Sequence, residues 1–120
     1  MAENPLVVKR ECDRFRPIYY AAASGDFNPI HIDKEMAQMA GLPGNILHGM
    51  CTMAWAVEAA VDALGGDPGS LRHVKVRFSK PVKIDDTITF TATRAGHRVE
   101  ISATNQDGDE VLKNAVAEGR

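Results

Sequence analysis

The segment "MCTMAWAVEAAVDAL", residues 50–64, is the most apolar part of the sequence and decides the fold. Its apolar side chains recur at intervals of three and four residues, which predicts a helix that Gly65 and Gly66 end. One predicted face of this helix consists of Met50, Met53, Ala54, Val57, Val61 and Leu64. Trp55, Ala59 and Ala60 extend the apolar surface, so that only Glu58 and Asp62 mark an exposed stripe. A helix that is apolar around most of its circumference is expected to be largely enclosed.

Downstream of this helix the period of the apolar residues changes from 3.6 to two, which is typical of strands. Apolar and polar side chains alternate in three segments: "HVKVRF" (73–78), "TITFTAT" (87–93) and "RVEISAT" (98–104). The segment "QDGD" (106–109) predicts a hairpin turn, and residues 110–117 are expected to form the last strand. Each strand has one apolar face, as in an antiparallel sheet that covers a core on one side.

Upstream, residues 6–12 predict a first strand and residues 13–23 a helix that ends at Gly25. Two starts are open for this helix, because Asp13 could cap it or Pro17 could occupy its first turn. A short helix is predicted over residues 34–39, with Asp33 as its N-cap. A sheet curled around one central helix accommodates all of these patterns. We therefore expect an α+β fold in which residues 1–120 form a single domain.

Composition and charge exclude several classes of protein. The 120 residues include 14 basic and 16 acidic side chains, and this net charge of −2 lacks the basic excess of a nucleic-acid binder. We expect no signal peptide, because no basic start precedes an apolar run, and no membrane span, because no apolar run reaches about 20 residues. Cys12 and Cys51 are too few for a disulfide scaffold, which favours the cytoplasm. A chain of this length buries a moderate core, so an oligomer is plausible.

The segment "SGDFNPIHID" (24–33) crowds two acids and a histidine around a proline. Pro29 fixes its own φ and pushes Asn28 away from helical geometry, so Asp26 and His31 flank a stiff turn. A carboxylate and an imidazole together supply a base and a proton donor near neutral pH, as the addition of water to an activated double bond requires. The alternative interpretation is a plain turn, since Asp and Asn are favoured turn formers.

The segment "LHGM" (47–50) places Gly49 at or just before the first turn of the apolar helix. The N–H group of Gly49 would then lack an acceptor within the helix and would lie at the positive end of its dipole. Such a group can polarise a carbonyl oxygen, and glycine lets a ligand approach closely. The alternative interpretation is that Gly49 merely begins a helix.

Taken together, "YAAASGDFNPIHIDKEMA" (20–37) and "HGM" (48–50) strongly resemble the MaoC-like (R)-specific enoyl-CoA hydratases and 3-hydroxyacyl dehydratases of fatty acid metabolism. The resemblance extends from residue 13 to the last predicted strand. It implies a hot-dog fold, in which an antiparallel sheet wraps around one long helix. The periodicity of the sequence predicts the same arrangement independently.

The resemblance also implies the roles of the site residues. Asp26 and His31 would be catalytic and would activate a water that adds to C3 of a trans-2-enoyl thioester while C2 is protonated. The reverse reaction would dehydrate a (3R)-3-hydroxyacyl thioester. The substrate-binding residues would be Asn28, His48 and Gly49. The Gly49 N–H would bind the thioester carbonyl, Asn28 would fix the turn, and His48 would position the neighbouring polar groups.

The resemblance implies no cofactor beyond the coenzyme A or acyl carrier protein that forms part of the substrate. It implies a homodimer, although a second hot-dog subunit of different sequence could replace one copy. Three features depart from the family pattern. The N-terminal segment is short, Pro17 interrupts the usual start of the first helix, and "AWAVEAA" (54–60) lacks the small polar residue that some relatives carry there.

Other residues and activities are weaker candidates. An acyl-CoA thioesterase would use the same substrates, with the water directed at C1. The phosphates of coenzyme A or an acidic carrier protein could meet Lys75, Arg77, Lys80 and Lys83. An acyl tunnel or the core could contain Met36, Met39, Met50 and Met53. The four histidines have no metal-ligand spacing, so no metal is expected, and Cys51 is expected to be a small buried side chain.

Overall fold

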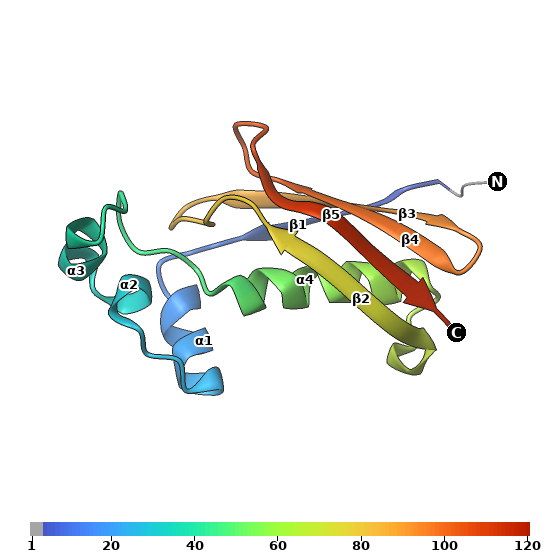
Figure 1. The fold of residues 1–120 in the computed structure, drawn as a ribbon, viewed down its shortest axis with the longest axis horizontal. Coiled ribbons are helices and arrows are strands. Elements are labelled where there is room, and N and C mark those ends of the chain that lie inside the picture. Colours follow the sequence, from blue (N-terminus) through green and yellow to red (C-terminus); the bar gives the residue numbers. More distant parts are fainter. Residues whose placement is uncertain (1–3) are drawn as a thin grey trace.

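The computed structural model describes residues 4–120 as one sheet with a long helix along one face (Figure 1). The strands are β1 (Leu6–Glu11), β2 (Leu71–Phe78), β3 (Thr87–Ala95), β4 (Arg98–Thr104) and β5 (Glu110–Gly119). The helices are α1 (Arg16–Ser24), α2 (Pro29–Ile32), α3 (Lys34–Met39) and α4 (Gly49–Ala63), and η1 (Pro68–Ser70) is a 3₁₀ turn. Every predicted strand and helix is confirmed, and α2 is the α-helix that the sequence did not predict.

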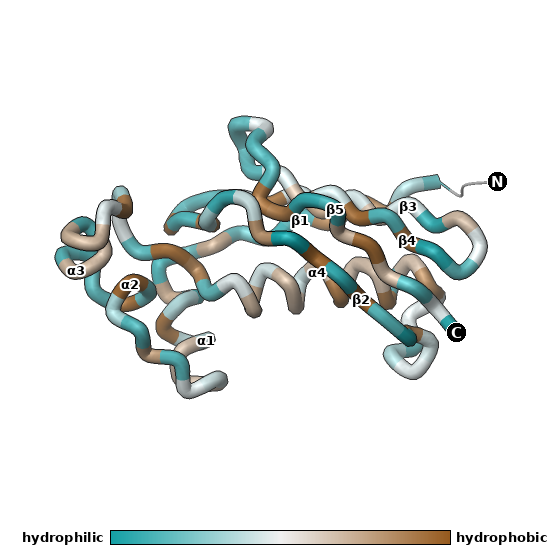
Figure 2. The backbone as a smooth tube through the Cα atoms, in the orientation of Figure 1, coloured by the Kyte–Doolittle hydropathy of each residue, from teal (hydrophilic) through white to brown (hydrophobic). Residues whose placement is uncertain are grey.

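The five strands form one antiparallel sheet in the order β1-β3-β4-β5-β2. Val8 lies opposite Phe90 at one edge of the sheet, and Val74 lies opposite Ala117 at the other. Along β2, hydrophobic and hydrophilic segments alternate as the period of two predicts (Figure 2). The sheet curls over α4, which is the hot-dog arrangement expected from the resemblance.

The core lies between α4 and the face of the sheet that α4 covers. Fully buried Ile88, Phe90 and Val99 come from the sheet, and the ring of Trp55 meets the ring of Phe90 edge-on, with 6.3 Å between their centroids. The buried residues of α4 are Cys51, Thr52, Trp55, Ala56, Ala59, Ala60 and Val61. Burial of this apolar surface, at about 25 cal/mol per Å², supplies most of the folding free energy of the helix.

The predicted enclosure of α4 is wrong within a single chain. The side chains of Met50 and Ala54, which the sequence placed on the apolar face, are exposed, and Met50 is 60% accessible. Met36 and Met39 are also exposed, so core packing does not account for them. The reason is that the sheet covers only one side of α4, and the helix presents its other apolar side to solvent.

The helices α1, α2 and α3 lie beyond the N-terminal end of α4, where they form a separate layer (Figure 1). Both suggested starts of α1 contribute, because Asp13 Oδ1 accepts hydrogen bonds from the N–H groups of Phe15 and Arg16, each at 2.9 Å, and Pro17 lies in the first turn. Gly25 ends α1 in the left-handed conformation, with φ at 80°. No helix within residues 4–120 is long and apolar enough to cross a membrane.

Candidate active site

The turn between α1 and α2 is fixed by its own polar side chains. Asn28 adopts φ −53° and ψ 128°, as the proline after it requires. Its Oδ1 atom accepts the Ile30 N–H at 3.2 Å, so Asn28 is the N-cap of α2. The Asp26 Oδ1 atom accepts the Asn28 N–H at 3.2 Å. These two bonds hold Asp26 and His31 on either side of a rigid turn.

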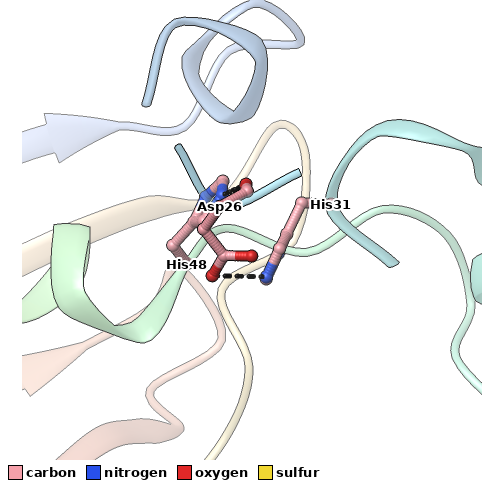
Figure 3. A group of neighbouring side chains, drawn as sticks. All are labelled: Asp26, His31 and His48. Carbon is pink, nitrogen blue, oxygen red and sulfur yellow. Dashed lines mark hydrogen bonds and ion pairs between the residues drawn. The ribbon is translucent and has the colours of Figure 1, made fainter. Parts of the chain in front are cut away.

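Asp26 and His31 face each other across the site (Figure 3). His31 Nε2 lies 4.0 Å from Asp26 Oδ2, which is beyond direct hydrogen-bonding distance. The ring of His31 is buried, whereas the side chain of Asp26 is 55% exposed. His31 Nδ1 lies 2.8 Å from the carbonyl oxygen of Ile46, so this nitrogen carries a proton and donates it. Nε2 is therefore the atom that can exchange a proton on the side of Asp26.

His48 lies beneath both residues and is only 2% exposed. Its ring stacks on the ring of His31, with 3.8 Å between centroids and 19° between planes. Its Nε2 atom donates to the backbone carbonyl of Asp26 at 2.8 Å. The ring of Tyr20, on α1, also packs on His48, with centroids 4.8 Å apart. His48 thus contacts both members of the predicted acid–base pair and is well shielded from solvent.

One possible ligand atom from each of Asp26, His31 and His48 lies within 4.8 Å of the other two, which is close enough to consider a metal ion. Two ring nitrogens are already bound to carbonyl oxygens, one on each histidine. Because the two rings are nearly parallel, a single ion cannot lie in the plane of both, as imidazole ligands require. This geometry suits an acid–base pair better than a metal centre, and the absence of a metal remains a prediction.

Gly49 is the first residue of α4, directly after His48. Leu47 N–H donates to Val82 at 2.8 Å, and the N–H groups of Cys51 and Thr52 donate to His48. The Gly49 N–H finds no acceptor in the described part of the chain, and it lies at the positive end of the dipole of α4. A Cβ atom at Gly49 would come within 3.2 Å of the Phe78 ring, so a larger residue there would require this ring to shift.

A cavity of about 220 Å³ opens beside Gly49. Its walls are the segment before α4, the first turn of α4 and the connection that follows β2. The residues around it include Ile46, Gly49, Thr52, Phe78, Val82 and Val111. Phe78 was expected to face the core, but it is 53% exposed because its ring extends past the sheet toward Gly49. The first turn of α4 is therefore open to a ligand on this side.

The structure brings together Asp26, His31 and His48, with Gly49 next in the chain. The sequence did not single out Tyr20 or Thr52. Tyr20 lies within the stretch that carries the family resemblance, but only the fold shows its contact with His48. Thr52 follows Gly49 by three residues in an apolar helix, and this spacing alone does not distinguish it from a packed side chain.

The four basic residues considered for phosphates do not form one site. Lys83 lines a cavity of about 520 Å³ together with Arg14 and Lys34, and the other three residues do not line it. Lys80 pairs with Asp109 at 3.3 Å. Lys75 and Arg77 line a different depression on the sheet.

The two cysteines are buried and unsuited to act as nucleophiles. Burial, with smaller contributions from Cys51, Asp86 and Asp13, raises the pKa of the Cys12 thiol to about 12. Burial also raises the pKa of Cys51, against a smaller lowering effect of Arg16. Both thiols therefore stay protonated near neutral pH, which confirms Cys51 as a small buried side chain.

Comparison with known proteins identifies the family of the chain. The chain is 34% identical over 114 residues to a Dictyostelium discoideum protein named probable enoyl-CoA hydratase 2, covering 92% of this chain and 39% of that protein. It is 32% identical over 113 residues to the mouse peroxisomal multifunctional enzyme type 2, covering 92% of this chain and 15% of the mouse protein. The chain thus spans less than half the length of these relatives.

Solved structures agree with the sequence comparison. The full-length peroxisomal multifunctional enzyme type 2 of Drosophila melanogaster superposes with a TM-score of 0.89 at 32% identity, over 98% of this chain and 23% of that one. The R-hydratase PhaJ1 of Pseudomonas aeruginosa superposes with a TM-score of 0.80 at 27% identity, over 97% of this chain and 78% of that one. The model of the MaoC like domain family matches residues 7–116. The chain therefore belongs to the MaoC-like domain family.

Proposed function

We propose that this chain is an (R)-specific enoyl-thioester hydratase. It adds water reversibly to a trans-2-enoyl group on coenzyme A or a carrier protein and forms a (3R)-3-hydroxyacyl thioester. The observation that carries the proposal is the 4.0 Å gap between His31 Nε2 and Asp26 Oδ2 beside the N-terminus of α4. One water can hydrogen bond to both atoms, because two bonds of about 2.8 Å span this distance.

In this mechanism Asp26 and His31 hold the water and remove its proton as its oxygen bonds to C3. The electrons of the C2–C3 double bond move toward the thioester carbonyl, whose oxygen binds the N–H of Gly49. The acid–base pair then gives the proton that it took from water to C2, which restores the carbonyl, so one water has been added in total. Asn28 acts through the turn that it caps and does not take part in proton transfer. No cofactor is needed for these steps.

The first experiment follows the conjugated absorbance of crotonyl-CoA after addition of the purified protein. A dehydrogenase specific for the (3R)-hydroxyacyl product reports its configuration. Loss of absorbance with formation of the (3R)-product is expected. Release of free thiol from a saturated acyl-CoA, without hydration, would instead identify the chain as a thioesterase, which is the alternative function.

A homodimer is the assembly that the exposed apolar surface favours. Met50 and Ala54 leave one side of α4 uncovered, and Phe27 and Tyr19 expose further apolar surface near the site. We expect sedimentation to give twice the 13.0 kDa mass of the chain. Ala54→Glu should shift the mass toward the monomer, whereas Asp62→Lys, on the polar stripe of the same helix, should not. A monomeric native protein that is active would contradict this expectation, and an inactive monomer would point to a second hot-dog subunit.

His48 is proposed as a positioning residue, because it is buried and touches both Asp26 and His31. His48→Phe keeps an aromatic ring on His31 but removes the donor to Asp26. His48→Gln keeps an N–H in place of Nε2. We expect His48→Phe to lower kcat by roughly 10- to 100-fold with little change in KM, because Asp26 and His31 lose their alignment. His48→Gln should keep most of the wild-type kcat. Equal kcat values for His48→Phe and wild type would contradict the positioning role.

Cytoplasmic location remains a prediction, as does the action of residues 1–120 as one domain. Fractionation of cells that express the tagged chain would test the first. The heat capacity profile on unfolding would test the second, because a single cooperative transition is the signature of one small domain.

A further inference from the structure

Thr52 is an unusual member of the buried face of α4. It is only 3% exposed and carries the single hydroxyl among the buried residues of this helix. The residues that share this face are Cys51, Trp55, Ala56, Ala59, Ala60 and Val61. A polar group at a buried position needs a hydrogen-bond partner to compensate for its lost hydration.

The usual partner of a helical threonine hydroxyl is the carbonyl oxygen four residues earlier. For Thr52 this is the oxygen of His48, which already accepts the N–H groups of Cys51 at 3.0 Å and Thr52 at 3.3 Å. Ser24 makes the corresponding side-chain bond in α1, to Tyr20 at 2.8 Å. The Thr52 hydroxyl makes no hydrogen bond to any residue between 4 and 120, and it is not fully shielded because Thr52 borders the cavity beside Gly49.

The geometry of the helix determines where the Thr52 hydroxyl points. Side chains of a helix tilt toward its N-terminus, so the hydroxyl of Thr52 lies over the turn that begins at Gly49. Both residues line the cavity of about 220 Å³. Asp26 and His31 do not line it, and the link to them is His48, which directly precedes Gly49 and contacts both. Most of the other side chains around it are apolar, and the ammonium of Lys80 pairs with Asp109. The Gly49 N–H and the Thr52 hydroxyl are thus two unpaired donors at one end of this cavity.

We propose that the Thr52 hydroxyl and the Gly49 N–H donate together to the thioester carbonyl oxygen of the substrate. This assignment rests on the proposed hydratase function and deepens it. When the oxygen of water bonds to C3, an electron pair moves through C2 to the carbonyl oxygen, which becomes enolate-like. Two donors fixed by one helical turn stabilise that charge before C2 is protonated.

The test compares Thr52→Val, which keeps the shape and removes the hydroxyl, with Thr52→Ser, which keeps the hydroxyl. With crotonyl-CoA, Thr52→Val is expected to lower kcat by about 10- to 100-fold with a smaller change in KM. The kcat of Thr52→Ser is expected to stay within about threefold of the wild-type value. Thr52→Ala removes the hydroxyl without new bulk and should match Val. Thermal unfolding should show that Val is at least as stable as wild type.

A spectroscopic measurement separates electrostatic polarisation from packing. Asp26→Asn protein is mixed with a dienoyl-CoA, whose absorbance shifts to longer wavelength when its carbonyl is polarised. The double variant Asp26→Asn/Thr52→Val should show a smaller shift of the absorbance. The double variant Asp26→Asn/Thr52→Ser should show the same shift as Asp26→Asn alone. Unchanged kcat and an unchanged shift with Val would overturn the role of Thr52 alone. A wild-type protein that neither hydrates crotonyl-CoA nor binds the dienoyl thioester would overturn the proposed function as well.

Discussion

Asp26→Asn is expected to lower kcat for crotonyl-CoA hydration by about 10²- to 10⁴-fold and to leave the fold intact. The substitution removes the negative charge that would take the proton of water. The amide keeps an oxygen that can accept the Asn28 N–H, so the turn is preserved. Because the side chain is 55% exposed, the free energy of unfolding should change by no more than about 0.5 kcal/mol. Initial rates and chemical unfolding curves provide the two measurements.

Asp107→Asn is the matched control for this substitution, since it makes the same chemical change in the exposed hairpin turn before β5. Its rate should equal that of wild type. If Asp26→Asn hydrates crotonyl-CoA at the wild-type rate, the carboxylate is not part of the chemistry and the proposed mechanism fails. If it is inactive but unfolded, the turn needs the charge for its structure.

The second large effect is expected for His31→Asn. Asparagine can keep an N–H close to the position of Nδ1, which bonds the Ile46 carbonyl at 2.8 Å, but it has no atom at the position of Nε2. Loss of Nε2 should lower kcat by about 10²- to 10⁴-fold. The smaller side chain also gives up the stacking contact with His48, so a loss of stability of about 1–2 kcal/mol is expected. Rates and urea unfolding test both expectations.

His97→Asn serves as the control, because His97 lies in the exposed turn between β3 and β4. The double variant Asp26→Asn/His31→Asn adds a stricter test. Two groups that hold one water act as a unit, so the double variant should lose little more activity than either single variant. Multiplied losses in the double variant would show that the two residues act in separate steps.

Much of this structure was predictable because its local signals agree. The alternation in "TITFTAT" and "RVEISAT" located β3 and β4, and the two glycines after residue 64 marked the end of α4. The effect of Pro29 on Asn28 predicted the stiff turn before His31. These signals depend on neighbouring residues only, so the sequence contains them in full.

The features that escaped prediction depend on tertiary contacts. Since α4 is apolar on nearly every side, its periodicity cannot indicate which side meets the sheet, and Met50 was placed on the wrong one. The stacking of His31 on His48 joins two elements 17 residues apart through the position of the whole N-terminal layer. Thr52 was overlooked because a threonine in an apolar helix has no pattern that distinguishes a ligand donor from a packed side chain.

The bond from His31 to the Ile46 carbonyl has a consequence for how this site can change over time. Ile46 fixes the imidazole, His48 supports it and Gly49 supplies the backbone donor, all within four consecutive residues. An insertion or deletion in the preceding loop, residues 41–45, would leave residues 46–49 intact as one segment, so their three contributions would stay together. Asp26 and His31 come from the turn at the start of α2, and the Asp26 carbonyl is bonded to His48. The length of this loop can therefore change while the spacing among the Ile46 carbonyl, the His48 ring and the Gly49 N–H is kept.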